Sequence, residues 1–315
     1  MSRDVTGVLV MAYGSPDNLE DVEAYYTHIR RGRKPSPEQL QNLIDRYKAI
    51  GGSALNELTF AVARGVEERL NEAAAGREIF RAYVGMKHWH PYIEETVGRM
   101  AADGIRRAVA LVLTPQYSRM SVGEYLRTAR ERAGQLGLTL AEVTHWWDEP
   151  AYLEFMAERV REAIAALPPD ARDGVPVVYT AHSLPQRILQ WDDPYPKELL
   201  ATARAVSEAA GVAQWHFAYQ SASQTGEPWL GPDILEKLEE LRRAGARAVV
   251  VAPMGFVCDH LEVRYDIDVE AAARAKELGM RLVRTESPNA HPAFVAMLAG
   301  VVRRHAGALP APEGT

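Results

Sequence analysis

Short, continuous apolar runs recur along the chain, and longer amphipathic segments separate most of them. Such runs are typical of strands in parallel sheets, because helices cover both faces of the sheet and leave no polar face. The pattern predicts eight strands in two sets of four. They lie near residues 7–13, 80–84, 108–113 and 138–144, and near residues 176–181, 216–220, 247–252 and 280–284.

Part of this pattern occurs twice. GVLVMAYGSP at Gly7–Pro16 parallels PVVYTAHSLP at Pro176–Pro185. The segments Phe80–Ser118 and Phe217–Val257 each contain a strand ending in Ala-Tyr, a polar loop with Trp and Pro, an amphipathic helix, a glycine and a second β-rich run. The repeat predicts two similar doubly wound, Rossmann-like α/β domains, each with a four-stranded parallel sheet. A ligand cleft is expected between them, at the carboxyl ends of the strands.

The boundary between the two domains is expected near a proline-rich segment. A helix predicted from Glu149-Pro150 to about Leu167 is ended by Pro168-Pro169-Asp170. We therefore assign residues 1–150 to the first domain and residues 151–315 to the second. The C-terminal helix, at about 290–306, has a single apolar face and is expected to pack back onto the first domain.

Composition narrows the function classes. The 315 residues carry a formal net charge of −6, which argues against a general nucleic-acid binder. The single cysteine, Cys258, cannot form an intrachain disulfide, a thiolate zinc site or an iron–sulfur cluster on its own. The apolar runs are too short to span a bilayer, and the first residues lack a secretory pattern. We expect a cytoplasmic monomer without a membrane span.

Two residues at predicted strand ends suggest chemistry. His182 follows the first strand of the second half, and Glu262 lies shortly after the third. One imidazole and one carboxylate suit a borderline divalent metal with open coordination positions, and they also suit proton abstraction. A single histidine at a strand end can instead stabilise a loop by hydrogen bonding. Its pairing with Glu262 favours the functional interpretation.

Two charged segments have two interpretations each. Glu262, Asp266 and Glu270 are spaced by four along one helix, where like charges repel. They form either a solvated acidic face or a path that guides cations in or protons out. The basic run His28–Pro35, followed by Arg46, is either a solvated loop or a carboxylate-binding surface.

From about Gly7 to His305 the sequence resembles the ferrochelatases, most closely the short ones of Gram-positive bacteria that act on coproporphyrin III. The motifs that carry the resemblance are VLVMAYGSP, YYTHIRRGRKP, DRYKAIGGS, AHSLP, DPYP, QSASQTGEPWLGPD and PMGFVCDHLEVRYD. The resemblance implies a lyase that inserts Fe²⁺ into coproporphyrin III, yields coprohaem and releases two pyrrole protons. Remote binding energy would bend the ring and expose its nitrogen lone pairs.

The resemblance also implies roles for individual residues. His182 and Glu262 would meet the iron, and Tyr13 would be an axial ligand on the opposite face of the ring. Contacts to the porphyrin are implied for Arg30, Arg46, Tyr47, Ser53 and Tyr125. The acidic row would continue inward through Asp266 and Glu270, with an auxiliary divalent cation nearby. Fe²⁺ is a substrate here, and no tightly bound cofactor or iron–sulfur cluster is expected. The expected partners are the porphyrin, ferrous iron and, in transient contacts, neighbouring haem-pathway enzymes.

Three other functions are weighed against this interpretation. Protoporphyrin IX could replace coproporphyrin III, although the basic run favours the substrate with four carboxylates. A cobalt or nickel chelatase would need more than one histidine at the metal, and His260 is the only candidate near the pair. A non-catalytic haem or metal carrier shares the two-domain plan, but such carriers are normally exported.

Overall fold

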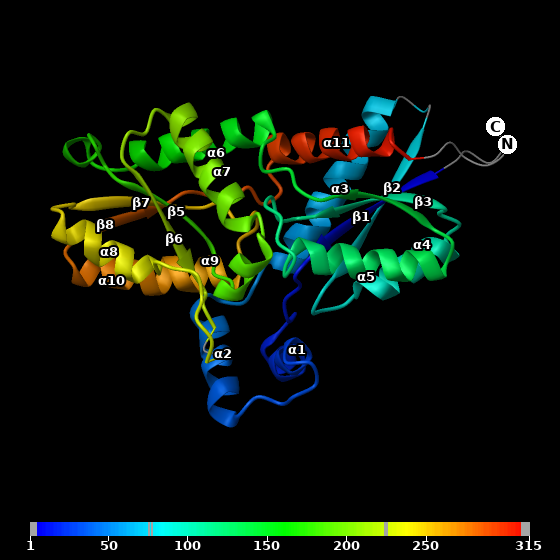
Figure 1. Ribbon diagram of the computed structural model, residues 1–315, viewed down its shortest axis with the longest axis horizontal. Coiled ribbons are helices and arrows are strands. Elements are labelled where there is room, and N and C mark those ends of the chain that lie inside the picture. Colours follow the sequence, from blue (N-terminus) through cyan, green and yellow to red (C-terminus); the bar gives the residue numbers. More distant parts are fainter. Residues whose placement is uncertain (1–4, 75, 77, 224–225, 310–315) are drawn as a thin grey trace.

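The computed structural model describes residues 5–74, 76, 78–223 and 226–309. It contains two parallel four-stranded sheets with the same topology (Figure 1). The first sheet has the order β2-β1-β3-β4, and the second has the order β6-β5-β7-β8. The strands are Val5–Ala12 (β1), Ile79–Met86 (β2), Arg107–Val112 (β3), Thr139–Val143 (β4), Val177–His182 (β5), Trp215–Gln220 (β6), Ala248–Pro253 (β7) and Arg281–Arg284 (β8). The predicted fold class is confirmed.

Helices cover both faces of each sheet, which explains the unbroken apolar strands. In β1, Leu9 and Met11 pack into one cluster while Val8 and Val10 pack into another, because successive side chains point to opposite faces. The helices of the first half are Val22–Ile29 (α1), Pro37–Ala49 (α2), Leu55–Ala74 (α3), Ile93–Ala102 (α4) and Val122–Gln135 (α5). Those of the second half are Pro150–Ala165 (α6), Tyr195–Ala210 (α7), Ile234–Arg243 (α8), Leu261–Val263 (α9) and Ala272–Glu277 (α10), followed by the C-terminal helix Pro292–Ala306 (α11). Short 3-10 turns lie at Leu19–Asp21 (η1), Pro169–Ala171 (η2) and Gln186–Trp191 (η3).

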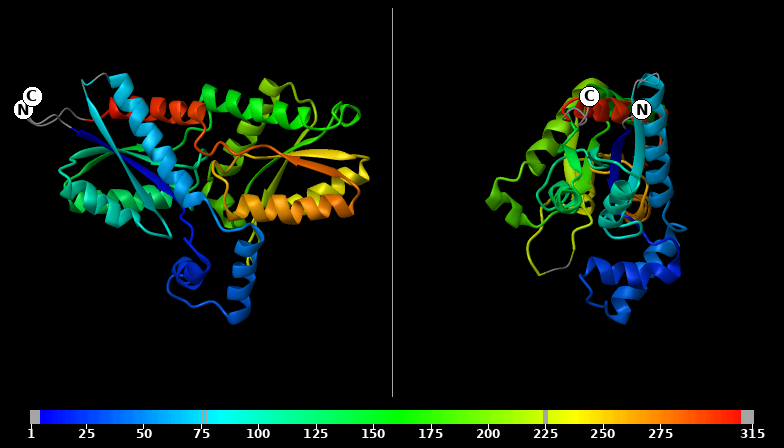
Figure 2. Two further views of the ribbon diagram at one scale, coloured as in Figure 1. Left: turned by 180° about the vertical axis from the view of Figure 1, so that it is seen from behind. Right: turned by 90° about the vertical axis from the view of Figure 1, so that its right-hand side faces the viewer.

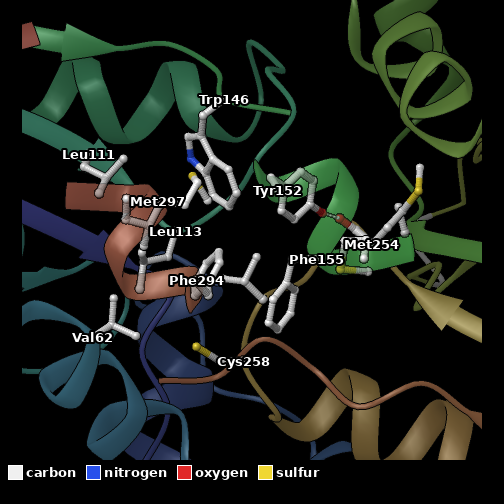
Figure 3. Close-up of a cluster of buried hydrophobic side chains, with 14 of the residues drawn as sticks. Val62, Leu111, Leu113, Trp146, Tyr152, Phe155, Met254, Cys258, Phe294 and Met297 are labelled. Carbon is white, nitrogen blue, oxygen red and sulfur yellow. Dashed lines mark hydrogen bonds between the residues drawn. The ribbon is translucent and has the colours of Figure 1, made fainter. Parts of the chain in front are cut away.

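One hydrophobic cluster extends through both halves of the molecule. At its centre Trp146 packs edge-on against Tyr152 with 5.1 Å between ring centroids, and Phe294 of α11 lies beside them (Figure 3). The Trp146 Nε1 donates to the carbonyl of Val112 at 3.1 Å, and the Tyr152 hydroxyl donates to that of Met254 at 2.9 Å. The two sheets therefore meet through a packed, hydrogen-bonded core.

The C-terminal helix crosses back over the first half of the chain. Helix α11 packs against α3, β3 and β4 of the first half and against α6 of the second (Figures 1 and 2). Its apolar face is fully buried, with Phe294, Leu298, Val301 and Val302 all at most 1% exposed. No helix in the described part of the chain is long and apolar enough to cross a membrane.

Helices α1 and α2 project from the body as a separate lobe (Figure 2). Helix α2 begins with a reciprocal cap, in which the Ser36 hydroxyl accepts from the Gln39 N–H and the Gln39 side chain accepts from the Ser36 N–H. The predicted basic run forms the end of α1 and the exposed loop that follows, where Arg31 and Gly32 both have positive φ. Helix α2 returns to contact the second half.

The helix predicted after Cys258 is unusual. It begins as the short α9 and continues from Arg264 to Ala271 as a π-helix (η4) before returning to α-helical geometry in α10. A π-helix has i→i+5 hydrogen bonds, is rare, and is often found at functional sites. Nothing in the apolar spacing of this segment predicts it. The acidic residues Glu262, Asp266 and Glu270 lie along this irregular stretch.

We predict that Tyr152→Phe lowers the free energy of unfolding by about 1–2 kcal/mol, because it leaves the Met254 carbonyl without its buried donor. Tyr26→Phe, on the partly exposed helix α1, is the matched control and should change stability by less than about 0.5 kcal/mol. Urea denaturation followed by fluorescence measures both. Equal effects of the two substitutions would contradict the role given to this hydrogen bond.

Candidate active site

A cavity of about 250 Å³ opens between the two halves, at the carboxyl ends of their strands. Its charged, aromatic and imidazole side chains come from both halves: Tyr13, Lys87, His88 and Tyr125 from the first, and His182, Tyr195, Phe256, His260 and Glu262 from the second. A second cavity of similar size lies on the outer edge of the first sheet, between α3, β2 and α4, away from these strand ends.

His182 and Glu262 meet in this cavity. His182 is the last residue of β5, and its Nε2 lies 3.3 Å from Oε1 of Glu262. Burial alone would lower the pKa of His182, but the carboxylate of Glu262 and a hydrogen bond to the Ser183 carbonyl raise it to about 9. Burial likewise opposes the charge on Glu262, yet the adjacent His182 and His260 hold its pKa below the usual range. The two groups form an ion pair in the free protein.

Hydrogen bonds to the backbone hold this pair in place. The Gln220 side chain donates to the carbonyl of Glu262 at 2.7 Å, and the Tyr195 hydroxyl donates to the carbonyl of His182 at 3.0 Å. Gly255 allows the chain after β7 to pass close to β5, because a Cβ there would lie 2.6 Å from the Cβ of Ala181. A glycine is therefore required beside the strand that carries His182.

His260 extends the pair. Its Nε2 lies 3.4 Å from Oε2 of Glu262, and its Nδ1 lies 2.9 Å from the Cys258 carbonyl oxygen. Glu262 thus sits between two imidazoles. Among the described residues there is no group of three or more His, Cys, Asp or Glu side chains arranged to hold a metal ion.

Tyr13 and Tyr125 line the same cavity from the first half. Tyr13 is 37% exposed to the open cavity. Burial of its phenol by the surrounding protein, together with the negative charge of Glu262, raises its pKa well above the usual range. Burial raises the pKa of Tyr125 in the same way. Both side chains are therefore neutral hydroxyls at physiological pH.

Sequence reasoning did not single out Lys87 and His88 as site residues. They follow β2 at its carboxyl end, in the segment KHWHP, so the strand-end rule could have found them. Lys87 forms an ion pair with Glu124, and its Nζ lies 5.2 Å from the ring centroid of Tyr125. The His88 ring lies 4.6 Å from that of Tyr13.

Arg46 lies beside the acidic row. It extends from α2 to the π-helix, with Nη1 3.5 Å from Oδ1 of Asp266 and Nη2 3.7 Å from Oε1 of Glu270. Its guanidinium also lies 4.6 Å from the ring centroid of Tyr265. Burial, together with the negative charges of Glu262 and Glu270, raises the pKa of Asp266 to about 6, although Ser221 and Arg46 act in the opposite direction.

The other predicted rim residues lie outside the lining of this cavity. Arg30 donates to the Arg33 carbonyl at 3.2 Å and lies over the ring of Tyr26. The hydroxyl of Ser53 accepts from the Leu55 N–H at the start of α3. Tyr47, on α2, is buried, and burial raises its pKa above the usual range. The structure therefore brings His182, Glu262, Tyr13 and Tyr125 together, places Arg46, Asp266 and Glu270 beside one another, and leaves Arg30, Ser53 and Tyr47 outside the cavity wall.

Two solved structures have a similar architecture over nearly the whole chain. The chain is similar to SirB from Bacillus subtilis with Fe³⁺ (TM-score 0.58, 12% identity, 96% of each chain covered). It is also similar to CbiX, described as the terminal enzyme of sirohaem biosynthesis in denitrifying bacteria (TM-score 0.53, 13% identity, 98% of this chain and 100% of that chain). At these identities the likeness shows only that the chain shares the fold of these two proteins.

The sequence comparison is more specific. The ferrochelatase family model matches residues 5–306, and the chain belongs to the ferrochelatase family. It is 46% identical over 310 residues to the coproporphyrin III ferrochelatase of Bacillus subtilis, covering 98% of this chain and 100% of that protein. The coproporphyrin III ferrochelatase of Geobacillus kaustophilus is 47% identical, with 96% of each chain covered. A ferrochelatase of Herpetosiphon aurantiacus is 45% identical, covering 94% of this chain and 98% of that protein.

We predict that the His182 imidazole titrates near pH 9 in the free protein and that Glu262→Gln lowers its titration midpoint. Without the carboxylate, burial, which disfavours the charged imidazole, is opposed only by the Ser183 carbonyl and the more distant Asp266. NMR titration of the histidine ring resonances measures the shift, with His182→Gln used to assign the signal. A midpoint that Glu262→Gln leaves unchanged would show that the two side chains are not coupled.

Proposed function

We propose that the protein inserts ferrous iron into coproporphyrin III, yields coprohaem and releases two pyrrole protons. The observation that carries this proposal is the identity of 46% and 47%, over nearly the whole chain, to two coproporphyrin III ferrochelatases. The cavity between the halves supports it, because an imidazole and a carboxylate meet at the strand ends where ligands of such folds bind.

His182 and Glu262 are the residues that we propose meet the iron. In the free protein His182 carries a proton, so it cannot accept another. A divalent cation arriving at Glu262 would repel that proton and lower the pKa of the imidazole. The neutral imidazole could then accept a pyrrole proton or coordinate the metal. The overall reaction balances as porphyrin with two N–H protons plus Fe²⁺ giving iron porphyrin plus two H⁺.

Tyr13 and Tyr125 are proposed to contact the macrocycle. Their phenols are neutral, so they present uncharged polar groups to the ring. Tyr13 directly follows the last residue of β1 and lines the cavity from the half opposite His182. From this position its hydroxyl could be an axial ligand to the product iron. Arg30, Arg46, Tyr47 and Ser53 are proposed to contact the ring substituents at the rim.

Iron is a substrate in this proposal, and no tightly bound cofactor is required. An auxiliary divalent cation is proposed near Asp266 and Glu270, where two carboxylates share one guanidinium. We further propose that the protein works in the cytoplasm as a monomer and passes its product on in transient contacts with haem-pathway enzymes. Protoporphyrin IX is the alternative substrate.

We predict that His182→Ala lowers kcat for metallation at least about 100-fold while porphyrin binding persists, because the buried base or ligand is lost. His145→Ala, which removes an exposed histidine, is the matched control and should keep full activity. Anaerobic assays with Fe²⁺ and coproporphyrin III follow the absorbance change of metallation, and fluorescence quenching follows binding. Wild-type turnover by the His182 variant would remove this residue from the mechanism.

We predict that coproporphyrin III is metallated in preference to protoporphyrin IX and that Arg30→Ala raises the KM for coproporphyrin III about tenfold. Four propionates offer more charge-assisted contacts than two, and partial exposure limits the strength of each contact. The matched control is Arg69→Ala, an exposed arginine of α3 paired with Glu72.

Higher salt should narrow the difference between the two porphyrins, because rim contacts are screened. Equal kcat/KM values for the two porphyrins would overturn the substrate proposal and leave the chelatase proposal standing. If Arg30→Ala leaves the KM for both porphyrins unchanged, the basic run is a solvated loop.

A further inference from the structure

A second set of contacts joins the two halves beside the cavity. The loop between β3 and α5 belongs to the first half, and helix α7 with the turn before it belongs to the second (Figure 1). Three hydrogen bonds connect them, from the Gln116 amide to the Thr202 hydroxyl at 3.2 Å, from the Tyr117 N–H to Glu198 at 2.7 Å, and from the Ser118 hydroxyl to Asp193 at 3.1 Å. The halves are therefore tied by polar contacts at the cavity as well as by the apolar core.

The carboxylate of Asp193 holds segments of both cavity walls. One of its oxygens, Oδ2, accepts from the Ser118 hydroxyl at 3.1 Å and from the Arg119 N–H at 2.8 Å. The other, Oδ1, accepts from the Tyr195 N–H at 3.1 Å. Met120, directly after the first two donors, lines the cavity from the first half, and Tyr195 lines it from the second. One side chain thus connects the two walls.

The Asp193 carboxylate is buried without a cation. The residue is 6% exposed, and no lysine, arginine or histidine side chain forms an ion pair with it in the part of the chain that the structure describes. Burial of a charge is costly unless hydrogen bonds replace the lost water, and here three donors do so. An uncharged side chain of similar size would avoid this cost, but it would lack two acceptor oxygens that point to opposite walls.

Both segments that Asp193 holds lead directly to side chains of the candidate site. On one side, Asp193 fixes the N–H of Tyr195, whose hydroxyl donates to the His182 carbonyl at 3.0 Å. On the other side, the segment held at Ser118 leads into α5, where Tyr125 lines the cavity. A change at Asp193 would therefore shift the wall that carries His182 relative to the wall that carries Tyr125.

We propose that Asp193 is a positioning residue for metallation, because its carboxylate sets the separation of the two cavity walls and thereby the bend imposed on the bound ring. The inference rests on the proposed function and adds a residue to the same site. Asp193 is not part of the cavity lining, so it acts through Tyr195 and through the segment that begins at Ser118. Binding depends on contacts spread over the whole cavity, whereas bending depends on the distance between its walls. Loss of the bridge therefore lowers kcat more than it raises KM.

Asp193→Asn tests the bridge with little change in side-chain volume. The amide keeps one acceptor oxygen, so it can hold one wall, and its NH₂ group then faces the donors of the other. We expect kcat for the metallation of coproporphyrin III to fall at least about tenfold, while KM changes less than about threefold. The matched control is Asp192→Asn, the same substitution at the exposed preceding residue, which is paired with Lys197. This control should keep full activity.

Two further measurements separate positioning from a general loss of stability. Resonance Raman spectra of the bound, metal-free porphyrin contain out-of-plane bands when the ring is bent, and these bands should weaken in Asp193→Asn but not in Asp192→Asn. Crystal structures of the free variants give the distance between Tyr125 and Tyr195 across the cavity, which should increase in Asp193→Asn alone.

Ser118→Ala is a milder variant that tests the same bridge from the first half. It removes one of the two donors to Oδ2 of Asp193 and leaves the Arg119 N–H in place. We expect a smaller loss of kcat than in Asp193→Asn, with a matching, smaller weakening of the Raman bands. This variant keeps the inference testable if Asp193→Asn does not fold.

The outcomes separate this inference from the proposed function. If the unmodified protein metallates coproporphyrin III and the folded Asp193 and Ser118 variants keep its kcat, the inference is overturned and the function stands. The same holds if kcat falls while the Raman bands keep their strength, because the bridge then does not bend the ring. If the unmodified protein does not metallate coproporphyrin III, the proposed function itself fails. An unchanged distance between Tyr125 and Tyr195 in the free Asp193 variant overturns the inference whatever the substrate.

Discussion

The packed core between the two halves is the constraint on which the site depends. Residues from both sheets line one cavity, so their separation is set by how rigidly the sheets are joined. Trp146, Tyr152 and Phe294 make that joint, and hydrogen bonds to Val112 and Met254 anchor it to the ends of β3 and β7. Close-packed interiors resist deformation, so the joint holds the cavity walls at a nearly fixed spacing. In the proposed function, binding energy bends a flat porphyrin ring, and this requires a cavity of fixed width.

Electrostatics divide the cavity into two regions. On the side of the first half, Tyr13 and Tyr125 are neutral, and Lys87, which also lines the cavity, is paired with Glu124. On the side of the second half, Glu262 is charged and the negative row continues through Asp266 and Glu270. A divalent cation is favoured only in the second region, whereas an apolar macrocycle suits the first. In the proposed function the two substrates would meet where these regions join, at the His182–Glu262 pair.

Much of the fold could be predicted from the sequence, because strands buried on both faces leave an unbroken apolar run and the internal repeat shows where such runs belong. His182 and Glu262 could be found because parallel strands bring their carboxyl ends to one edge. The contacts of Arg46 could not, since they join α2 to a helix more than 200 residues away and no periodic pattern records that packing. The π-helix left no signal either, because its apolar spacing does not distinguish it from an α-helix. Lys87 and His88 were within reach of the strand-end rule and were missed because their segment reads as an ordinary polar loop.

The duplicated sheets also bear on the symmetry of the ligand. Strands β1 and β5 occupy the same position in their sheets, each second in order and followed by Pro16 or Pro185 at the same spacing. In that register Tyr13 corresponds to His182, since each follows an alanine at the strand end. A planar macrocycle has two faces that are chemically alike until a metal approaches one of them. An internal pseudo-twofold arrangement offers one equivalent position to each face. If the ring binds between the halves as proposed, the divergence of that position into a neutral phenol and a charged imidazole would give it a front and a back.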